Sequence, residues 1–274
     1  MSGRVFPASP HGTPAHPAYE QLRPVTAAAS VVLAENPSPM TLDGTNTWIL
    51  RAPGQTGCVV VDPGPEDPTH LDRLAACGPV ELVLLTHRHL DHTEAARTFA
   101  ERVGAPVRAL DPTLTLGAEG LGAGERLGVA GLDLRVLVTP GHTDDSLCLV
   151  VDDDGSVLTG DTVLGYGTTV LGDYPGALTD YLDSLRGLAE LPAGTTLLPG
   201  HGPDLPDARE TAEYYLRHRE QRLDQVRAAL GELGPDPSPR QVVEIVYADV
   251  DEQLWPAADQ SVAAQLEHLR RVDG

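Results

Sequence analysis

Short apolar runs recur along the chain before residue 205, and most of them end at a glycine-containing or polar turn. Continuous apolar runs of this length are typical of strands that are buried on both faces. Strands, or turns leading into strands, are expected at 25–34, 41–50, 57–61, 80–85, 134–138, 147–151, 157–158 and 195–198. The acidic turn after residue 151 joins two of these strands into a predicted hairpin.

Helical spacing of apolar residues lies between the strands and dominates the end of the chain. It predicts helices at 69–76, 93–103 and 178–188. A long charged helix is expected over 207–233, and two shorter helices are expected at 240–247 and 259–271 after a proline-rich break. The pattern therefore predicts a layered α/β domain followed by a small helical unit.

The composition limits the class of protein and of partner. The 274 residues suit one large domain, alone or with a small appendage, and the 41% of apolar residues can fill a core. The formal net charge is −21, and all 19 basic residues are arginines. Such a chain repels phosphate backbones at long range, which argues against general binding to nucleic acids or to anionic membranes.

The first 24 residues are rich in proline and are expected to form a loosely ordered lead-in, with His11 and His16 in loops. They lack the apolar core of a signal peptide, and no apolar run is long enough to span a membrane. The three cysteines show no CxxC pair, which makes a disulfide framework improbable. These features favour a cytoplasmic protein without a membrane span.

The segment 87–92 has the sequence His-Arg-His-Leu-Asp-His and directly follows a predicted buried strand. Imidazole and carboxylate groups are suitable ligands for Zn²⁺, Fe²⁺ or Mn²⁺. His87 and His89 can point the same way, while Asp91 and His92 can face a neighbouring point. One loop could thus serve two metal ions, although a chance surface cluster is the alternative.

The same pattern recurs downstream, which weighs against chance. His142, Asp161 and His201 each follow a predicted strand and each stand beside a glycine. Asp62 also lies at a strand end, before a Pro-Gly turn. Because functional groups of layered α/β folds collect where strands end, these side chains are expected to converge on one site.

The ordered series HxHxDH, GHT, GD and GHG resembles the metallo-β-lactamase superfamily. The segments TLDGTNT, TPGHTDDS, GDTVLGYGTTV and PGHGP are further similar to the β-lactamase-like protein 2 family. The resemblance implies a four-layered αββα sandwich with a small C-terminal winged-helix-like domain. The implied division is a lead-in at 1–24, a metallo-β-lactamase domain at 25–206 and a helical domain at 207–274.

The resemblance also implies how the ligands divide. One metal would be held by His87, His89 and His142. The second would be held by Asp91, His92 and His201, with Asp161 bridging the two and Asp62 supporting the ligand loop.

Two such cations, zinc or alternatively iron or manganese, can share a water molecule and lower its pKa toward neutrality. The bridging hydroxide could attack an ester, thioester, amide or phosphodiester, and Asp91 could orient it. The expected protein is therefore a metal-dependent hydrolase. Its site would be locally positive, which favours a small anionic or acyl substrate over nucleic acid.

Two other functions stay open at this stage. Some members of the related family cut single-stranded RNA, and the helical domain could hold the strand, although few aromatic residues are present for base stacking. The metals could also serve a non-catalytic or redox role. The long helix could bind RNA, cover the cleft or make a homodimer contact.

Several positions are weaker candidates for substrate contacts. Tyr166, Thr168 and Thr169 lie in a glycine-rich loop after Asp161, and Asn46 lies on an early strand; all four could instead serve packing or turns. The histidines at 70, 218 and 268 fall within predicted helices and are interpreted as surface residues.

Overall fold

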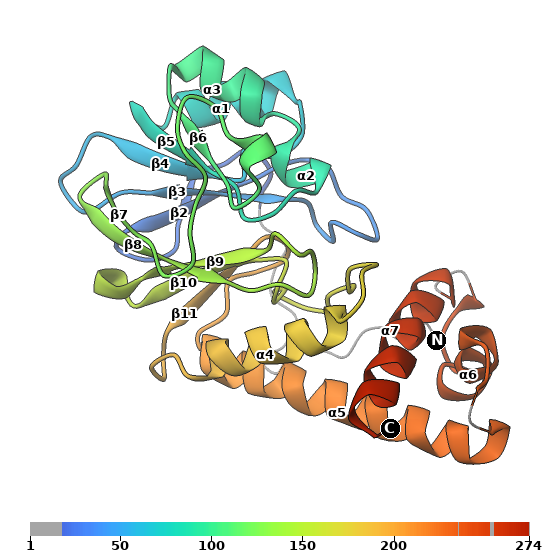
Figure 1. Cartoon of the computed structure of the whole chain (residues 1–274). Coiled ribbons are helices and arrows are strands. Elements are labelled where there is room, and N and C mark those ends of the chain that lie inside the picture. Colours follow the sequence, from blue (N-terminus) through green and yellow to red (C-terminus); the bar gives the residue numbers. More distant parts are fainter. Residues whose placement is uncertain (1–17, 235, 253–254, 274) are drawn as a thin grey trace.

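Two β-sheets face each other at the centre of the molecule (Figure 1). The computed structural model describes residues 18–234, 236–252 and 255–273, and within them the sheets have the orders β1-β2-β3-β4-β5-β6 and β11-β10-β9-β8-β7. The first sheet contains β1 (Arg23–Pro24), β2 (Ala29–Leu33), β3 (Asn46–Leu50), β4 (Cys58–Val61), β5 (Val80–Leu84) and β6 (Val107–Arg108). The second contains β7 (Arg126–Val129), β8 (Leu132–Val138), β9 (Leu147–Val151), β10 (Ser156–Gly160) and β11 (Thr196–Pro199).

Helices cover the outer face of each sheet, so the molecule has four layers (Figure 1). Helices α1 (Pro68–Ala75) and α3 (Ala96–Val103) pack on the first sheet through Leu74 and Phe99. Helices α4 (Ala177–Ala189) and α5 (Ala208–Leu233) pack on the second sheet. The expected αββα sandwich is therefore confirmed.

The apolar runs correspond to strands buried on both faces, as expected. In β4, Val59 and Val61 point into the core between the sheets, whereas Cys58 and Val60 pack under the outer helices. Alternate side chains of a strand point to opposite faces, so a sandwiched strand needs apolar residues at every position.

Two pairs of neighbouring parallel strands bring the chemically active segments together. Strand β4 pairs in parallel with β5, and their carboxyl ends lead to Asp62 and His87. Strand β10 pairs in parallel with β11, and their carboxyl ends lead to Asp161 and His201. Because parallel strands end at the same edge of a sheet, each pair delivers its side chains to one place.

The helix predicted over 93–103 begins three residues later, and a separate short helix precedes it. Helix α2 (Leu90–Thr93) is one short turn, and α3 begins after a break and ends at Gly104, whose φ of 71° is a left-handed conformation suited to glycine. The short turn keeps Asp91 and His92 apart from the regular helix.

The C-terminal unit consists of three helices within the described residues. Helix α5 begins after Asp207, whose side chain caps it, and runs for 26 residues as expected. Its first half packs on α4 through Ala212, and its second half packs through Val226 on α6 (Pro239–Val246) and α7 (Trp255–Val272). The long helix thus belongs to both units.

The start of the chain differs from the expected lead-in. Residues 1–17, with His11 and His16, lie outside the described residues, but Arg23–Pro24 already form β1, which pairs with β2. All three cysteines are free thiols, and Cys58 and Cys148 are buried. Among the described helices, none has the length and apolar character needed to span a membrane.

Candidate metal centre

Four loops meet at one edge of the sandwich and bring the seven proposed ligands together. The loop after β5 and helix α2 supply four of them, and the loops after β8, β10 and β11 supply one each. They are His87, His89, Asp91, His92, His142, Asp161 and His201. Their donor atoms form three overlapping groups, in each of which all atoms lie within 4.8 Å of one another.

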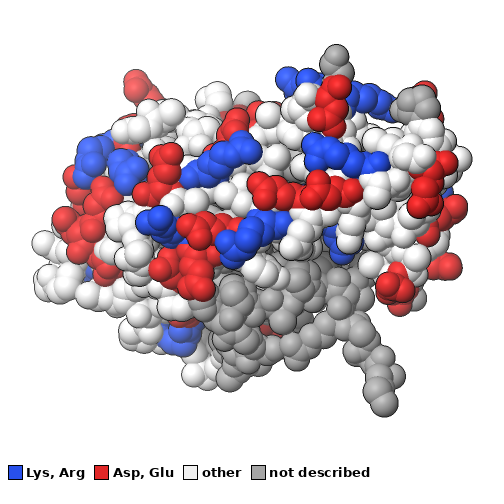
Figure 2. All heavy atoms as spheres, turned by 90° about the horizontal axis from the view of Figure 1, so that it is seen from below, with Lys and Arg blue, Asp and Glu red and all other residues white. Residues whose placement is uncertain are grey.

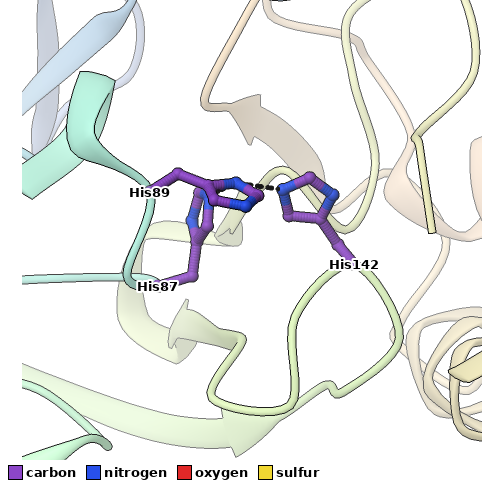
Figure 3. A group of neighbouring side chains, drawn as sticks. All are labelled: His87, His89 and His142. Carbon is purple, nitrogen blue, oxygen red and sulfur yellow. Dashed lines mark hydrogen bonds between the residues drawn. The ribbon is translucent and has the colours of Figure 1, made fainter. Parts of the chain in front are cut away.

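The first group consists of His87, His89 and His142, whose rings point toward one another (Figure 3). Nδ1 of His89 lies 3.1 Å from Nε2 of His87 and 2.8 Å from Nε2 of His142. Burial lowers the pKa of His142 to about 4 and the pKa of His87 well below its ordinary value. These rings are therefore neutral at pH 7, the form in which imidazole binds metals.

The second group consists of Asp91, His92 and His201. Nε2 of His201 lies 3.2 Å from Nε2 of His92 and 3.0 Å from Oδ2 of Asp91. Burial lowers the pKa of His201, but the nearby Asp161 carboxylate outweighs it and raises that pKa to about 9. A cation is favoured between these side chains, whether it is a proton or a metal ion.

The third group consists of His87, His92 and Asp161, so it shares one histidine with each of the other two groups. Asp161 thus lies between those groups. Its Oδ2 is 3.6 Å from Nε2 of His142 and 3.3 Å from Nε2 of His201, and its Oδ1 is 3.5 Å from Nε2 of His92. Oδ1 is buried and has no hydrogen-bond partner in the described part of the chain. A buried carboxylate oxygen without a donor is costly, and a bound cation would remove that cost.

Two ligand rings are oriented by hydrogen bonds from Nδ1, the ring nitrogen that faces away from the metal centre. Nδ1 of His142 donates to the Val170 carbonyl at 2.7 Å, and Nδ1 of His201 donates to the Gly44 carbonyl at 3.0 Å. Each ring therefore directs Nε2 inward as the metal-binding atom. Without a cation, several lone pairs would face one another at hydrogen-bonding distance.

Asp62, which directly follows β4, orients two further ligand rings through hydrogen bonds. Its Oδ2 accepts hydrogen bonds from Nδ1 of His92 at 2.8 Å and from the Thr86 hydroxyl at 2.6 Å. Its Oδ1 accepts the Thr86 backbone N–H at 2.8 Å. Since the Thr86 hydroxyl donates to Asp62, its oxygen can accept Nδ1–H of His87 at 3.0 Å. One carboxylate thereby orients a ring in each group.

Replacing Asp62 with asparagine is expected to weaken metal binding about 10–100-fold, the usual cost of losing an outer hydrogen-bond partner. The new amide N–H₂ would face both the Thr86 hydroxyl and Nδ1 of His92. Nδ1 would then have to accept, which moves the ring proton to Nε2 and removes a ligand. Metal affinity should be measured by competition with a chromophoric chelator.

The matched control is Asp67→Asn, because Asp67 caps α1 away from the centre and asparagine caps helices equally well. If the Asp62 variant bound metal as tightly as this control, the proposed role of Asp62 would be wrong.

The donor set fits divalent metal ions. Nitrogen and carboxylate donors in two groups joined by Asp161 suit zinc, and they also suit iron or manganese. Gly200 supports this fit, because a Cβ at that position would lie 2.5 Å from Oδ1 of Asp161 and 2.8 Å from Cε1 of His92. The backbone at Gly200 therefore lies so close to these two ligands that no side chain would fit there.

The four candidate substrate contacts have different positions. Asn46 is buried, and its Nδ2 donates to the carbonyls of Pro199 and Gly202. Both hydrogens of its amide therefore hold the loop of His201, which is the structural role left open for Asn46 beside substrate contact. Tyr166 lies against Gly202 and near Asp43, and it is not among the residues that line the cavity described below.

Thr168 and Thr169 do line a cavity beside His142 and Asp161. Thr169 is buried, and its hydroxyl donates to the Asp161 carbonyl at 2.8 Å, so it positions a ligand. Thr168 is half-buried and remains a candidate for substrate contact.

The cavity has a volume of about 160 Å³, and its walls come from both units. The sandwich contributes the loops at 39–42 and 164–170, and the C-terminal unit contributes side chains from α5, α7 and the segment after α6. The side chains from the C-terminal unit are His218, Arg219, Arg222, Tyr247, Val250, Ala258 and Ser261. The sequence pointed to none of these residues individually, although it left open that the long helix covers the cleft.

The sequence contains one feature that indicates this part of the cavity wall. Arg219 and Arg222 are three apart on a helix and share a face, but this face was interpreted as solvated. Two other histidine predictions were also wrong: His218 lines the cavity, and His70 is fully buried, with Nε2 2.8 Å from the Thr47 hydroxyl.

Known proteins match the chain over nearly its whole length. Residues 40–201 match the metallo-β-lactamase superfamily model, and residues 238–273 match the β-lactamase-associated winged helix domain. A β-lactamase-like protein 2 homolog of Drosophila melanogaster is 30% identical, with 90% of this chain and 89% of that protein covered.

Two solved structures are also similar. A β-lactamase domain protein from Burkholderia ambifaria has a TM-score of 0.82 at 22% identity, with 97% and 92% of the two chains covered. TTHA1623 in a di-iron-bound form has a TM-score of 0.53 at 26% identity, with 68% and 96% covered. The chain therefore belongs to the metallo-β-lactamase superfamily, as a hydrolase whose histidine and aspartate side chains can hold metal.

Proposed function

We propose that the protein is a dinuclear zinc hydrolase that acts on an ester, thioester, amide or phosphodiester bond. The observation that carries this proposal is the position of Asp161, within 3.6 Å of histidine nitrogens from both ligand groups. One metal would be held by His87, His89 and His142. The other would be held by Asp91, His92 and His201, with Asp161 shared.

When bound, two such cations lower the pKa of a water molecule toward neutrality and polarise the bond to be cleaved. The chain's residues hold the reacting groups in place. Asp91 is the more exposed of the two acids, with 29% of its side chain accessible against 9% for Asp161. Its carboxylate can therefore accept a proton from the attacking water, whereas Asp161 stays buried between the groups.

The substrate is proposed to be a small anionic or acyl compound rather than nucleic acid. A net charge of −21 repels a long polyanion. On the face that Figure 2 shows, arginines alternate with acidic side chains and form no continuous basic surface. Pairs such as Arg227 with Asp224 and Arg186 with Asp183 follow this pattern.

Zinc is proposed from the mixture of nitrogen and carboxylate donors. Iron is the main competitor, because TTHA1623 is described in a di-iron-bound form and is 26% identical over 68% of this chain. Metal analysis of the purified protein, followed by exchange, would separate the two.

The test is a panel of chromogenic substrates assayed with the zinc-loaded and the chelated protein. The panel contains a 4-nitrophenyl ester, an acyl thioester, a 4-nitroanilide and bis(4-nitrophenyl) phosphate. We expect two zinc ions per chain, turnover of at least one substrate, loss of turnover with EDTA and recovery with zinc. Full turnover by the metal-free protein would refute the proposal.

An unstructured RNA oligomer completes the panel. We expect it to remain intact under the conditions that cleave the small substrates. Zinc-dependent cleavage of the RNA that disappears with His89→Ala would establish the endoribonuclease alternative instead.

A further inference from the structure

The cavity beside His142 and Asp161 has two chemically different walls. Apolar side chains line one part of it, among them Leu42, Leu164 and Val250. Basic groups line another part, where His218, Arg219 and Arg222 project from α5. The acidic residue among the lining residues is Asp161, which the proposed function assigns to the metals.

The two arginines of this wall are unusual within the described part of the chain. Most of the other described arginines form ion pairs with carboxylates, for example Arg217 with Glu213 on the same helix. Arg219 and Arg222 form none with the carboxylates of the described residues, although the chain has 40 acidic residues. In so acidic a protein, two guanidinium groups left without carboxylates are available to an anion from outside.

Neighbouring groups hold both guanidinium groups in place. Arg219 is buried, donates to the Thr169 carbonyl at 2.5 Å and lies over the Tyr181 ring, while its Nε has no hydrogen-bond partner among the described residues. Arg222 is half-buried, and its Cζ lies 4.7 Å from the centre of the Tyr247 ring. Its Nη1 donates a hydrogen bond to Oε1 of Gln225 at 2.9 Å. A side chain fixed in this way loses little entropy on binding.

His218 adds a polar group without adding charge. Burial and then the two neighbouring arginines lower the pKa of its imidazole to about 4, so that the ring is neutral at pH 7. The basic wall thus offers two permanent charges and one neutral imidazole.

We propose that this cavity binds the acyl part of a small substrate that carries an anionic group, a carboxylate or a phosphate, and that Arg222 recognises that group. This inference rests on the proposed function, because it places the bond to be cleaved at the neighbouring metal centre. Arg222 determines specificity and takes no part in the bond-breaking step. Arg219, which is tied to Thr169, mainly positions the loop and adds to the positive potential.

The size of the cavity restricts the substrate further. A volume of about 160 Å³ is below the roughly 300–1,000 Å³ of ordinary ligand pockets. The group inside must therefore be compact, such as a short dicarboxylic acyl chain. A single guanidinium beside such a group can pair with it in a bidentate manner.

The test uses two esters that differ in one charge, 4-nitrophenyl hydrogen succinate and methyl 4-nitrophenyl succinate, with the zinc-loaded full chain. We expect kcat/KM for the charged ester to be about tenfold higher, mainly through KM, as one charge-assisted contact allows. Arg222→Gln should abolish this preference, Arg222→Glu should reverse it, and Arg222→Lys should keep part of it. Arg217→Gln, on the same helix, should leave it unchanged.

Binding without turnover separates this inference from the proposed function. The probes are 4-(4-nitrophenoxy)butanoate, its methyl ester and 3-(4-nitrophenoxy)propyl phosphate, titrated by calorimetry into the wild type and Arg222→Gln. Preferential binding of either anion that requires Arg222 supports the cavity even if no ester is hydrolysed, and the tighter anion identifies the group. Equal binding of anionic and neutral probes, or a preference that survives in a folded Arg222→Gln protein, overturns it.

Discussion

Replacing Asp161 with asparagine is expected to remove metal from both halves of the centre and to lower kcat/KM by about 10³-fold or more, the upper range for losing one group that stabilises developing charge. Asp161 is the residue whose oxygens lie near His142 on one side and near His92 and His201 on the other. Asparagine keeps the shape but removes the negative charge and one of the two acceptor oxygens. Metal content per chain and steady-state kinetics measure the two effects.

The control for this variant is Asp204→Asn. Asp204 lies just beyond the loop of His201, but it pairs with Arg23 at the surface, where an ion pair contributes little to stability. This variant should keep two metal ions and full activity. Retention of both metals and near-normal turnover by Asp161→Asn would contradict the shared-ligand assignment.

Gly200→Ala is expected to lower kcat/KM by about 10²-fold, the loss that a misplacement of about 1 Å can cause. The added methyl group would lie 2.5 Å from Oδ1 of Asp161 and 2.8 Å from Cε1 of His92, well inside van der Waals contact. Either the two ligands or the loop itself must shift. Metal affinity should fall with activity, while circular dichroism at 25 °C should show the same secondary structure.

Gly187→Ala serves as the matched control, because Gly187 is in α4 and an added Cβ would meet no atom within 4 Å. Alanine is the better helix former, so this protein should be slightly more stable and fully active. If Gly200→Ala behaved in the same way, the close approach of the backbone to the metal centre would have no functional importance.

The layers and strands were predictable from the sequence because burial on both faces leaves a local signal. The strand β4 reads as four apolar residues in a row and ends at Asp62-Pro63-Gly64, so both the strand and its tip were visible. The HxHxDH segment was equally clear, since its ligands are close in sequence. The structure now shows that its side chains lie beside His142, Asp161 and His201.

The errors concern side chains whose partners are remote in sequence. His70 was interpreted as a surface residue, but its ring is enclosed by Thr47 on β3 and Glu20 near the start of the chain. Asn46 was a candidate either for substrate contact or for a structural role, and its amide donates to carbonyls more than 150 residues away. No pattern within one helix or strand records such contacts, because packing between distant segments decides them.

The cavity wall was missed for the same physical reason. On α5, Arg219 and Arg222 are surrounded in sequence by acidic residues, and that composition is typical of a solvated helix. Only the packing of the helix on the sandwich brings these two arginines into the wall of the cavity that His142 and Asp161 also line.

Helix α5 is continuous from the sandwich into the C-terminal unit. Metal binding and the proposed substrate selectivity are therefore assigned to different parts of the chain and can evolve separately. The proposed metal ligands lie between residues 87 and 201, whereas much of the cavity wall comes from residues after 217. Under the proposed function, mutations in the middle of α5 and in the segments that follow it would change substrate selectivity and leave the metal ligands intact. Related hydrolases could therefore acquire different substrate ranges through changes in the C-terminal part of the chain alone.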